Sequence, residues 1–259
     1  MNTLVFDIET IPDIEGGRKL YNLGDLDAEG IAQAMFHLRA QKTGSEFLAH
    51  HLHRIVAISV TFRGRGDEFK VWTLGDEQAS EKEIIQRFFD GIDRYTPTIV
   101  SWNGSGFDLP VIHYRAMLHK IAAPRYWDMG EDDQSFKWNN YISRYHTRHT
   151  DLMDLLALYS GRANAPLDEL ATLYGFPGKM GMSGGKVWEA YQAGKLSEIR
   201  NYCETDVLNT CLVYLRFQLM RGHITHEKYA MECELVRKVL KQSGKAHLQA
   251  FESAWEQGA

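Results

Sequence analysis

Five side chains in three separate segments have the types and spacing needed to hold metal ions. Asp7 and Glu9 follow a short apolar run, and residues two apart on a strand share one face. Two like charges at the end of a buried strand repel each other unless a cation lies between them. Tyr202 and Asp206 stand four residues apart, which puts the phenol and the carboxylate on one helix face. Asp108 lies about midway between these two segments.

This set of groups suits phosphodiester hydrolysis. Four carboxylates carry a charge that two divalent cations would balance, and Mg²⁺ prefers a few carboxylates, with water or phosphate oxygens in its remaining positions. Two such ions activate an attacking water and stabilise the departing oxygen of an in-line displacement. A tyrosine hydroxyl, with an ordinary pKa of about 10, is better suited to orienting that water than to removing its proton.

Each acid also has a purely structural interpretation. Asp108 precedes Leu109 and Pro110, and an Asp followed by Pro in the first turn is a common helix start, so capping is an equally good explanation. Asp206 alone could be an ordinary charge on a solvated helix face. The combination of all three segments favours a shared site.

The residues around these acids resemble the three exonuclease motifs of the DEDD superfamily. The motifs are FDIETIPD (6–13), SWNGSGFDLP (101–110) and YCETD (202–206), and the Tyr of the third is typical of the tyrosine branch. Further segments, HTDLMDLL (149–156) and FPGKMGMSGGKVW (176–188), are similar to the predicted 3′-5′ exonucleases related to the proofreading domain of family B DNA polymerases. The resemblance covers about residues 1–219 and implies an α/β, ribonuclease H-like fold: a mixed sheet, with an antiparallel hairpin plus parallel strands, flanked by helices.

The same resemblance implies a role for each residue. Asp7, Glu9, Asp108 and Asp206 would hold two Mg²⁺ or Mn²⁺ ions, with Asp7 bridging both, and Tyr202 would position the nucleophilic water. The expected enzyme is a metal-dependent 3′-5′ exonuclease that releases nucleoside 5′-monophosphates from single-stranded or frayed DNA, or from RNA. Two other functions stay open: a non-catalytic nucleic-acid-binding or partner subunit of the same fold, and an endonuclease of the wider ribonuclease H-like class.

Candidate substrate contacts lie beside the motifs. Thr10, Asn103 and Phe107 adjoin the acids, although Asn103 could instead brace its own turn. Lys179 and Lys186 belong to a glycine-rich run that could meet a phosphate through backbone amides and lysines. This run lacks the P-loop pattern, so an ordinary flexible connection explains it equally well.

Residues 125–149 combine aromatic and basic side chains without helical periodicity. Stacking faces and cations are what a protein needs to hold a single strand, so this segment could be a strand-gripping flap. It could equally be a hairpin or loop that packs its aromatics onto the body. Asp151, just beyond it, could assist the site from behind or cap the helix that follows. The aromatic residues concerned are Tyr126, Trp127, Phe136, Trp138, Tyr141 and Tyr145.

The pattern of the remaining sequence predicts a mixed sheet flanked by helices. Strands are expected at 4–9, 55–61, 69–73 and 98–101, and residues 14–53 form an insertion with helix at 28–41. Helices are expected after Ser80, which can cap with Glu83, and from Leu109, Leu152, Leu167, Lys186 and Leu196. Residues 1–259 are expected to form a single exonuclease domain, with the core motifs in 1–219 and a helical tail in 220–259 that packs on the body or on a second subunit.

Composition narrows the class further. The net charge of -5 excludes a protein held to nucleic acid by overall charge, although a local basic channel remains compatible with it. The three cysteines show no CxxC spacing, which argues against a disulfide framework or a zinc site. No basic leader or long apolar stretch is present, so we expect a soluble cytoplasmic protein without membrane contact. The expected partner is the 3′ end of a nucleic acid, with single-stranded DNA favoured; protein partners and self-association stay open.

Overall fold

The computed structural model describes residues 2–258 and is built around a five-stranded sheet in the order β3-β2-β1-β4-β5. β1 pairs antiparallel with β2 and parallel with β4, while β2 and β3 are antiparallel and β4 and β5 parallel. The strands are β1 (Thr3–Pro12), β2 (His53–Arg63), β3 (Phe69–Thr73), β4 (Thr98–Ser101) and β5 (His149–Asp151). The predicted α/β class and the ribonuclease H-like mixed sheet are therefore confirmed.

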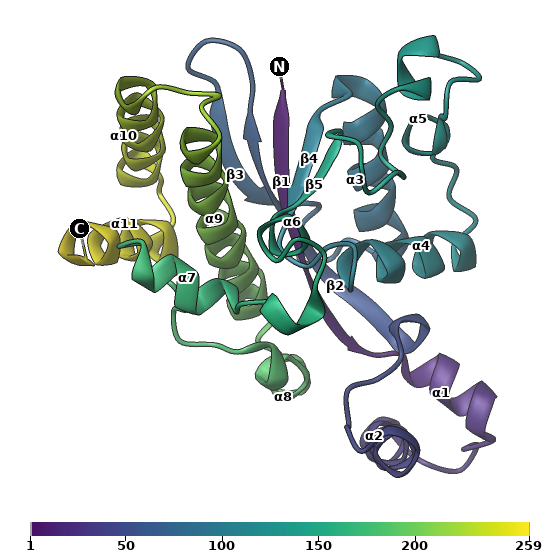
Figure 1. Ribbon diagram of the computed structural model, residues 1–259. Helices are drawn as coiled ribbons and strands as arrows, with labels where there is room; N and C mark the ends of the chain where they lie inside the picture. The colour runs from purple at the N-terminus through teal and green to yellow at the C-terminus, as the bar shows by residue number, and fades with distance from the viewer. Residues whose placement is uncertain (1, 259) are drawn as a thin grey trace.

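The central strand β1 has an apolar side chain at nearly every position before the site. Leu4, Phe6 and Ile8 point to one face and join the core beneath α3 and α4, whereas Val5 points to the other and packs under α9. Figure 1 shows these two helical layers on opposite sides of the sheet. Asp7 and Glu9 share the Val5 face because the period is two, so both carboxylates are directed toward α9.

The flanking helices include the elements expected from the sequence. Ser80 caps α3 by accepting from the Glu83 N–H, as predicted. The bounds are α3 (Glu81–Tyr95), α4 (Asp108–Leu118), α5 (Pro124–Trp127), α6 (Leu152–Leu156), α7 (Leu167–Leu173), α8 (Val187–Gln192) and α9 (Leu196–Met220), with short 3₁₀ turns η2 (Gln134–Lys137), η3 (Gly161–Ala163) and η4 (Gly184–Lys186).

The C-terminal tail packs on the body of the same chain. It forms α10 (His226–Gln242) and α11 (Ala246–Gly258), which lie beside α9 (Figure 1). Leu240, Phe251 and Trp255 are buried in the same cluster as Leu208 and Leu212 of α9. The tail thereby fixes the outer side of the helix that carries the third motif.

The insertion between β1 and β2 forms a small subdomain with a core of its own. It contains α1 (Ile14–Tyr21), α2 (Ala28–Thr43) and the 3₁₀ turn η1 (His50–Leu52), and α1 was not expected from the sequence. Asp13 caps α1 by accepting from the Gly16 N–H. Gly17 lies so close to Met35 that a Cβ there would overlap its sulfur, which explains a glycine inside this helix. Within residues 2–258, no helix is long and apolar enough to cross a membrane.

Candidate active site

The first two motifs meet at the carboxyl end of β1. A register shift between Glu9 and Thr10 ends the regular pairing with β2 just after the acidic pair. The Asp108 carboxylate accepts a hydrogen bond from the backbone N–H of Ile8, at 3.2 Å, so it lies between the two acids of β1 along the chain. Asp108 is the first residue of α4, and its N-cap, Phe107, makes no side-chain cap hydrogen bond. The capping interpretation of Asp108 is therefore wrong.

Helix α9 brings the third motif to the same place. The Sγ atom of Cys203 lies 3.5 Å from Oδ2 of Asp7, and the ligand atoms of Asp7, Glu9 and Cys203 all lie within 4.8 Å of one another. Tyr202 is hydrogen-bonded to Asp206, whose charge raises the pKa of Glu9. The four acids and Tyr202, which the sequence placed in three distant segments, thus converge.

The acids of this cluster repel one another. Burial, followed by the charges of Asp108, Glu9 and Asp206, raises the pKa of Asp7 well above its ordinary value. The pKa of Glu9 is raised in the same way, by burial first and then by the charges of the neighbouring carboxylates. Burial also raises the pKa of Asp108 to about 7 and that of Asp206 to about 6. Such a group of acids is costly unless a cation offsets it.

The donors fit hard divalent cations. Within residues 2–258, buried carboxylates such as Glu81 and Glu204 are paired with a basic side chain, Arg115 and Lys245 respectively, whereas no ion pair involves the four clustered acids. Lys179 approaches closely enough to lower the pKa of Glu9. Carboxylate oxygens are the ligands that Mg²⁺ and Mn²⁺ prefer. Burial raises the pKa of the neighbouring Cys203 thiol, which disfavours the thiolate that zinc would require.

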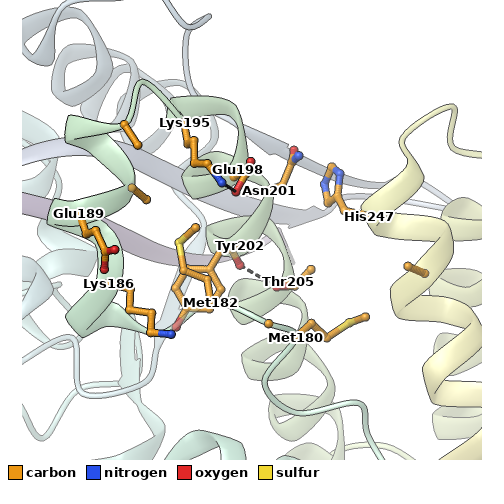
Figure 2. A pocket seen from close by; sticks show the side chains of 14 residues that line it. Met180, Met182, Lys186, Glu189, Lys195, Glu198, Asn201, Tyr202, Thr205 and His247 are labelled. Carbon is orange, nitrogen blue, oxygen red and sulfur yellow. Dashed lines mark hydrogen bonds and ion pairs between the residues drawn. The ribbon is translucent and has the colours of Figure 1, made fainter.

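Tyr202 is buried and faces both the acids and a pocket. Burial and the charges of Asp206 and Glu9 raise the pKa of Tyr202 well above its ordinary value, so the phenol keeps its proton and can donate. On its other side Tyr202 borders a pocket of about 530 Å³, shared with Met182, Lys186 and His247 (Figure 2). The predicted substrate residue Lys186 is exposed and lines this pocket.

The loop of the second motif is held in place by Asp151. Its carboxylate accepts from the backbone N–H groups of Asn103, at 3.0 Å, and Ser105, at 2.8 Å. Asp151 also caps α6, so both of its predicted roles, in support of the site and as a cap, are present. Asn103 adopts a left-handed conformation, with φ of 63°, and its carbonyl accepts from the N–H of Phe107. Asn103 therefore braces its own turn, which confirms one of its two interpretations.

The glycine-rich run is anchored at its first two residues, Gly178 and Lys179. The Asn209 side chain accepts from the Gly178 N–H and donates to its carbonyl, at 3.2 and 2.7 Å. The backbone N–H of Lys179 donates to Asp168, which leaves the lysine side chain free to approach Glu9. Since Asn209 belongs to α9, the helix that carries the third motif also positions this predicted substrate lysine.

The aromatic segment 125–149 divides into two groups. Tyr126, Phe136 and Tyr141 are buried in the core beneath α3, so the interpretation of packing onto the body is right for these three. Trp138 and Tyr145 are 77% and 80% exposed, which leaves them available for stacking. A role in gripping a strand stays a prediction for this second group.

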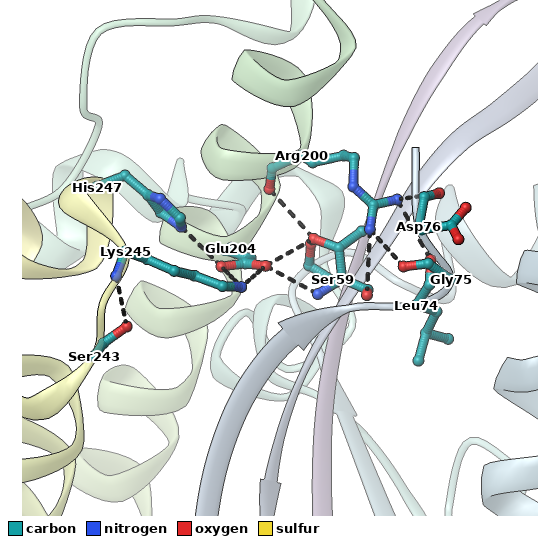
Figure 3. Close-up of polar contacts among 10 residues, drawn as sticks. Ser59, Leu74, Gly75, Asp76, Arg200, Glu204, Ser243, Lys245 and His247 are labelled. Carbon is teal, nitrogen blue, oxygen red and sulfur yellow. Dashed lines mark hydrogen bonds and ion pairs between the residues drawn. The ribbon is translucent and has the colours of Figure 1, made fainter. Parts of the chain in front are cut away.

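The far side of α9 is fastened by a buried acid within the third motif. Glu204 accepts from the N–H of Thr73 in β3 and from Lys245 and His247 of the tail, at 2.7 to 3.0 Å (Figure 3). These contacts outweigh the effect of burial and hold the pKa of Glu204 below its ordinary value. Arg200, one turn earlier, donates to the carbonyls that follow Thr73. The site is thus supported from behind by β3 and by α11.

Sequence reasoning missed Cys203, Glu204 and His53 as parts of the site or its support. Cys203 could have been found, because it stands three residues before Asp206 and so shares a helix face with it. His53 bonds to Thr10 through Nδ1, at 2.9 Å, but no local pattern links residues 43 positions apart.

Comparison with known proteins finds one matching family profile and a short match to a DNA polymerase. A family profile described as "Predicted 3'-5' exonuclease related to the exonuclease domain of PolB" matches residues 45–255, a range that contains Asp108, Tyr202 and Asp206 and begins after Asp7 and Glu9. A stretch of 38 residues is 55% identical to DNA polymerase 1 of Sulfurisphaera ohwakuensis and covers 15% of this chain and 4% of that polymerase.

A solved structure also resembles this chain. The family B DNA polymerase of the hyperthermophilic archaeon Pyrobaculum calidifontis matches 85% of this chain and 24% of its own, with a TM-score of 0.49 and 18% identity. The chain therefore spans only a small part of the length of both polymerases. Because the family profile covers most of the chain, this protein belongs to the family of predicted 3′-5′ exonucleases related to the exonuclease domain of PolB.

Proposed function

We propose that this protein removes nucleoside 5′-monophosphates from the 3′ end of single-stranded or frayed DNA, or of RNA, with two Mg²⁺ or Mn²⁺ ions. One observation carries the proposal: carboxylates from three distant segments converge without a paired basic side chain, on the scaffold of a predicted exonuclease family. Residues 1–259 would act as one exonuclease domain.

The four acids would hold the ions. Asp7, Glu9, Asp108 and Asp206 supply carboxylate oxygens only, and their mutual repulsion provides the driving force for binding cations. When bound, two divalent ions lower the pKa of an attacking water and offset charge on the departing oxygen. The Ile8 N–H keeps the Asp108 carboxylate oriented toward this site.

The other residues would position the reacting groups. Tyr202 keeps its proton and is hydrogen-bonded to Asp206, so its hydroxyl is held beside the acids, where it can orient the attacking water. Lys179 brings a positive charge to the acids and is suited to a phosphate oxygen of the substrate. Thr10 and Phe107 directly follow and precede metal-ligand candidates, so they are proposed contacts of the terminal nucleotide. Asn103 and Lys186 remain candidate contacts farther from the acids.

The test is the product pattern on an oligonucleotide labelled at its 5′ end. An exonuclease that works from the 3′ end gives a ladder that shortens one nucleotide at a time, in the presence of Mg²⁺ or Mn²⁺. Asp7→Asn should abolish the ladder, while Asp25→Asn, which changes an exposed acid between α1 and α2, should leave it intact. Matched DNA and RNA strands report the preferred nucleic acid.

Two results would reject the proposal. Internal cuts in place of a ladder would indicate an endonuclease. Absence of cleavage together with absence of metal binding in a calorimetric titration would indicate a binding module that keeps only the fold.

A further inference from the structure

The insertion between β1 and β2 returns to the sheet beside the acidic cluster. Three rings near its end, those of Phe47, His50 and His53, surround the Phe107 ring of the second motif. The centroid of Phe107 lies 5.4 Å from Phe47, 5.8 Å from His50 and 5.1 Å from His53. We refer to these four residues as the aromatic wall. Figure 1 shows α1 and α2 of the insertion extending from the ends of β1 and β2.

Hydrogen bonds attach the wall to both acidic motifs. The Nδ1 atom of His53 lies 2.9 Å from Oγ1 of Thr10, the residue after Glu9, and its Nε2 atom donates to the Leu48 carbonyl. Burial lowers the pKa of His53 to about 4, so this ring is neutral near pH 7. His50 donates from Nε2 to the carbonyl of Gly106, at 2.8 Å, two residues before Asp108. The wall is therefore attached directly beside both acidic motifs.

Phe47 is the outer ring of the wall and is 57% exposed. Its backbone is fixed, because Arg39 donates to the Phe47 carbonyl, at 2.9 Å, and the Phe47 N–H donates to Ser45 Oγ. More than half of the Phe47 side chain is therefore open to solvent next to the acidic motifs. A flat apolar group can stack there without any rearrangement of the backbone.

We infer that the aromatic wall stacks on the nucleobase of the 3′-terminal nucleotide, with Phe47 of the insertion as the outermost contact. The inference rests on the proposed function and assigns a role to residues 14–53. Stacking reads no hydrogen-bond pattern, so the contact accepts any base and distinguishes a nucleotide with a base from one without. A terminal phosphate at the acids and a base at the wall would together orient the scissile bond.

The experiment compares two substrates that differ only in the terminal base. One 5′-labelled oligonucleotide ends in an adenine nucleotide and the other in an abasic residue, and kcat/KM is measured for removal of that residue. The wild-type protein should favour the adenine end at least tenfold, equivalent to about 1.4 kcal/mol. Phe47→Ala should reduce this preference to within about twofold and leave the rate on the abasic end unchanged. Phe47→Tyr, which keeps a ring, should retain it.

A control and a second measurement complete the test. Tyr95→Ala removes another exposed ring, at the end of α3 before the amino end of β4, and should keep the wild-type preference. Binding of an oligonucleotide with 3′-terminal 2-aminopurine, titrated in EDTA, should quench its fluorescence with the wild type and quench it several-fold less with Phe47→Ala.

The outcomes separate this inference from the proposed function. If Phe47→Ala lowers kcat/KM equally on both substrates, or leaves the preference for the adenine end unchanged, the stacking role of the aromatic wall is rejected while the exonuclease activity stands. Quenching that depends on Phe47 in a protein without nuclease activity would support the stacking role of the wall and reject the exonuclease. If the wild type shows no cleavage and no quenching, both proposals are rejected.

Discussion

Removing one charge from the acidic cluster should stabilise the metal-free protein. Asp108→Asn keeps the size of the side chain and an oxygen that can accept from the Ile8 N–H, so it changes little except the charge. Because burial raises the pKa of Asp108, the folded state disfavours the ionised carboxylate that the unfolded chain accepts readily. The substitution removes this penalty, and with it one ligand for the cations.

The magnitude follows from the pKa. A rise from 3.8 to about 7 corresponds to a penalty of up to about 4 kcal/mol above pH 7, which disappears as the pH falls toward 3.8. Structural relaxation reduces this penalty, and the neighbouring acids carry part of it. We therefore expect Asp108→Asn to raise the free energy of unfolding by about 1 to 4 kcal/mol at pH 7.5. For a chain of this size, each kcal/mol raises Tm by about 2 to 4 °C.

The assay is thermal unfolding in EDTA, at pH 7.5 and at pH 5. The gain should be smaller at pH 5, because the wild-type carboxyl is then largely protonated in the folded state. The control is Asp128→Asn, which alters an acid that is equally buried, at 5% exposed. Burial alone would raise the pKa of Asp128, but the N–H groups of Gly130, Asp132 and Asp133 outweigh it and lower the pKa, so this variant should lower Tm.

Metal binding should change these Tm values differently in the two proteins. Saturating Mg²⁺ should raise the Tm of the wild type by more than that of Asp108→Asn, because the wild type has one more ligand and more repulsion to relieve. A lower Tm for metal-free Asp108→Asn, or an equal Mg²⁺ effect in both proteins, would refute the view that the acids form an uncompensated cluster.

Three further predictions concern the surroundings of the site. Tyr202→Phe should lower kcat about 10- to 100-fold with little change in metal affinity, because it removes one hydrogen bond and no charge; single-turnover kinetics and calorimetry check this. Glu204→Gln should lower the free energy of unfolding by about 1 to 3 kcal/mol through loss of its ionic contact with Lys245, measured by urea unfolding. Burial lowers the pKa of His149 to about 4, so its protonation opposes folding as the pH falls from about 6.5 to 4; His149→Gln should make stability less pH-dependent in that window, by up to about 3 kcal/mol.

The strands and the acids were predictable because each has a local signal. The period of two along β1 identified both the strand and the face that Asp7 and Glu9 share. The spacing of Tyr202 and Asp206 likewise identified a helix face. Convergence of these segments came from the resemblance to a known family, since no local pattern gives the distance between Asp7 and Asp206.

The supporting contacts could not be read from the sequence. β5 has only three residues, too few to show alternation, and it exists because β4 offers a partner. α1 was overlooked because its two glycines suggested a loop, whereas one of them permits close packing on Met35. The approach of Phe47 to Phe107 depends on how the whole insertion folds back, and only the tertiary structure reveals it.

The most direct measurement of the central claim is a crystal structure of the protein soaked in Mn²⁺ with a nucleoside 5′-monophosphate. We expect two anomalous peaks among the carboxylates of Asp7, Glu9, Asp108 and Asp206, with the phosphate between these peaks and the Tyr202 hydroxyl. Absence of bound metal at these acids, or a single ion ligated by Cys203, would contradict it.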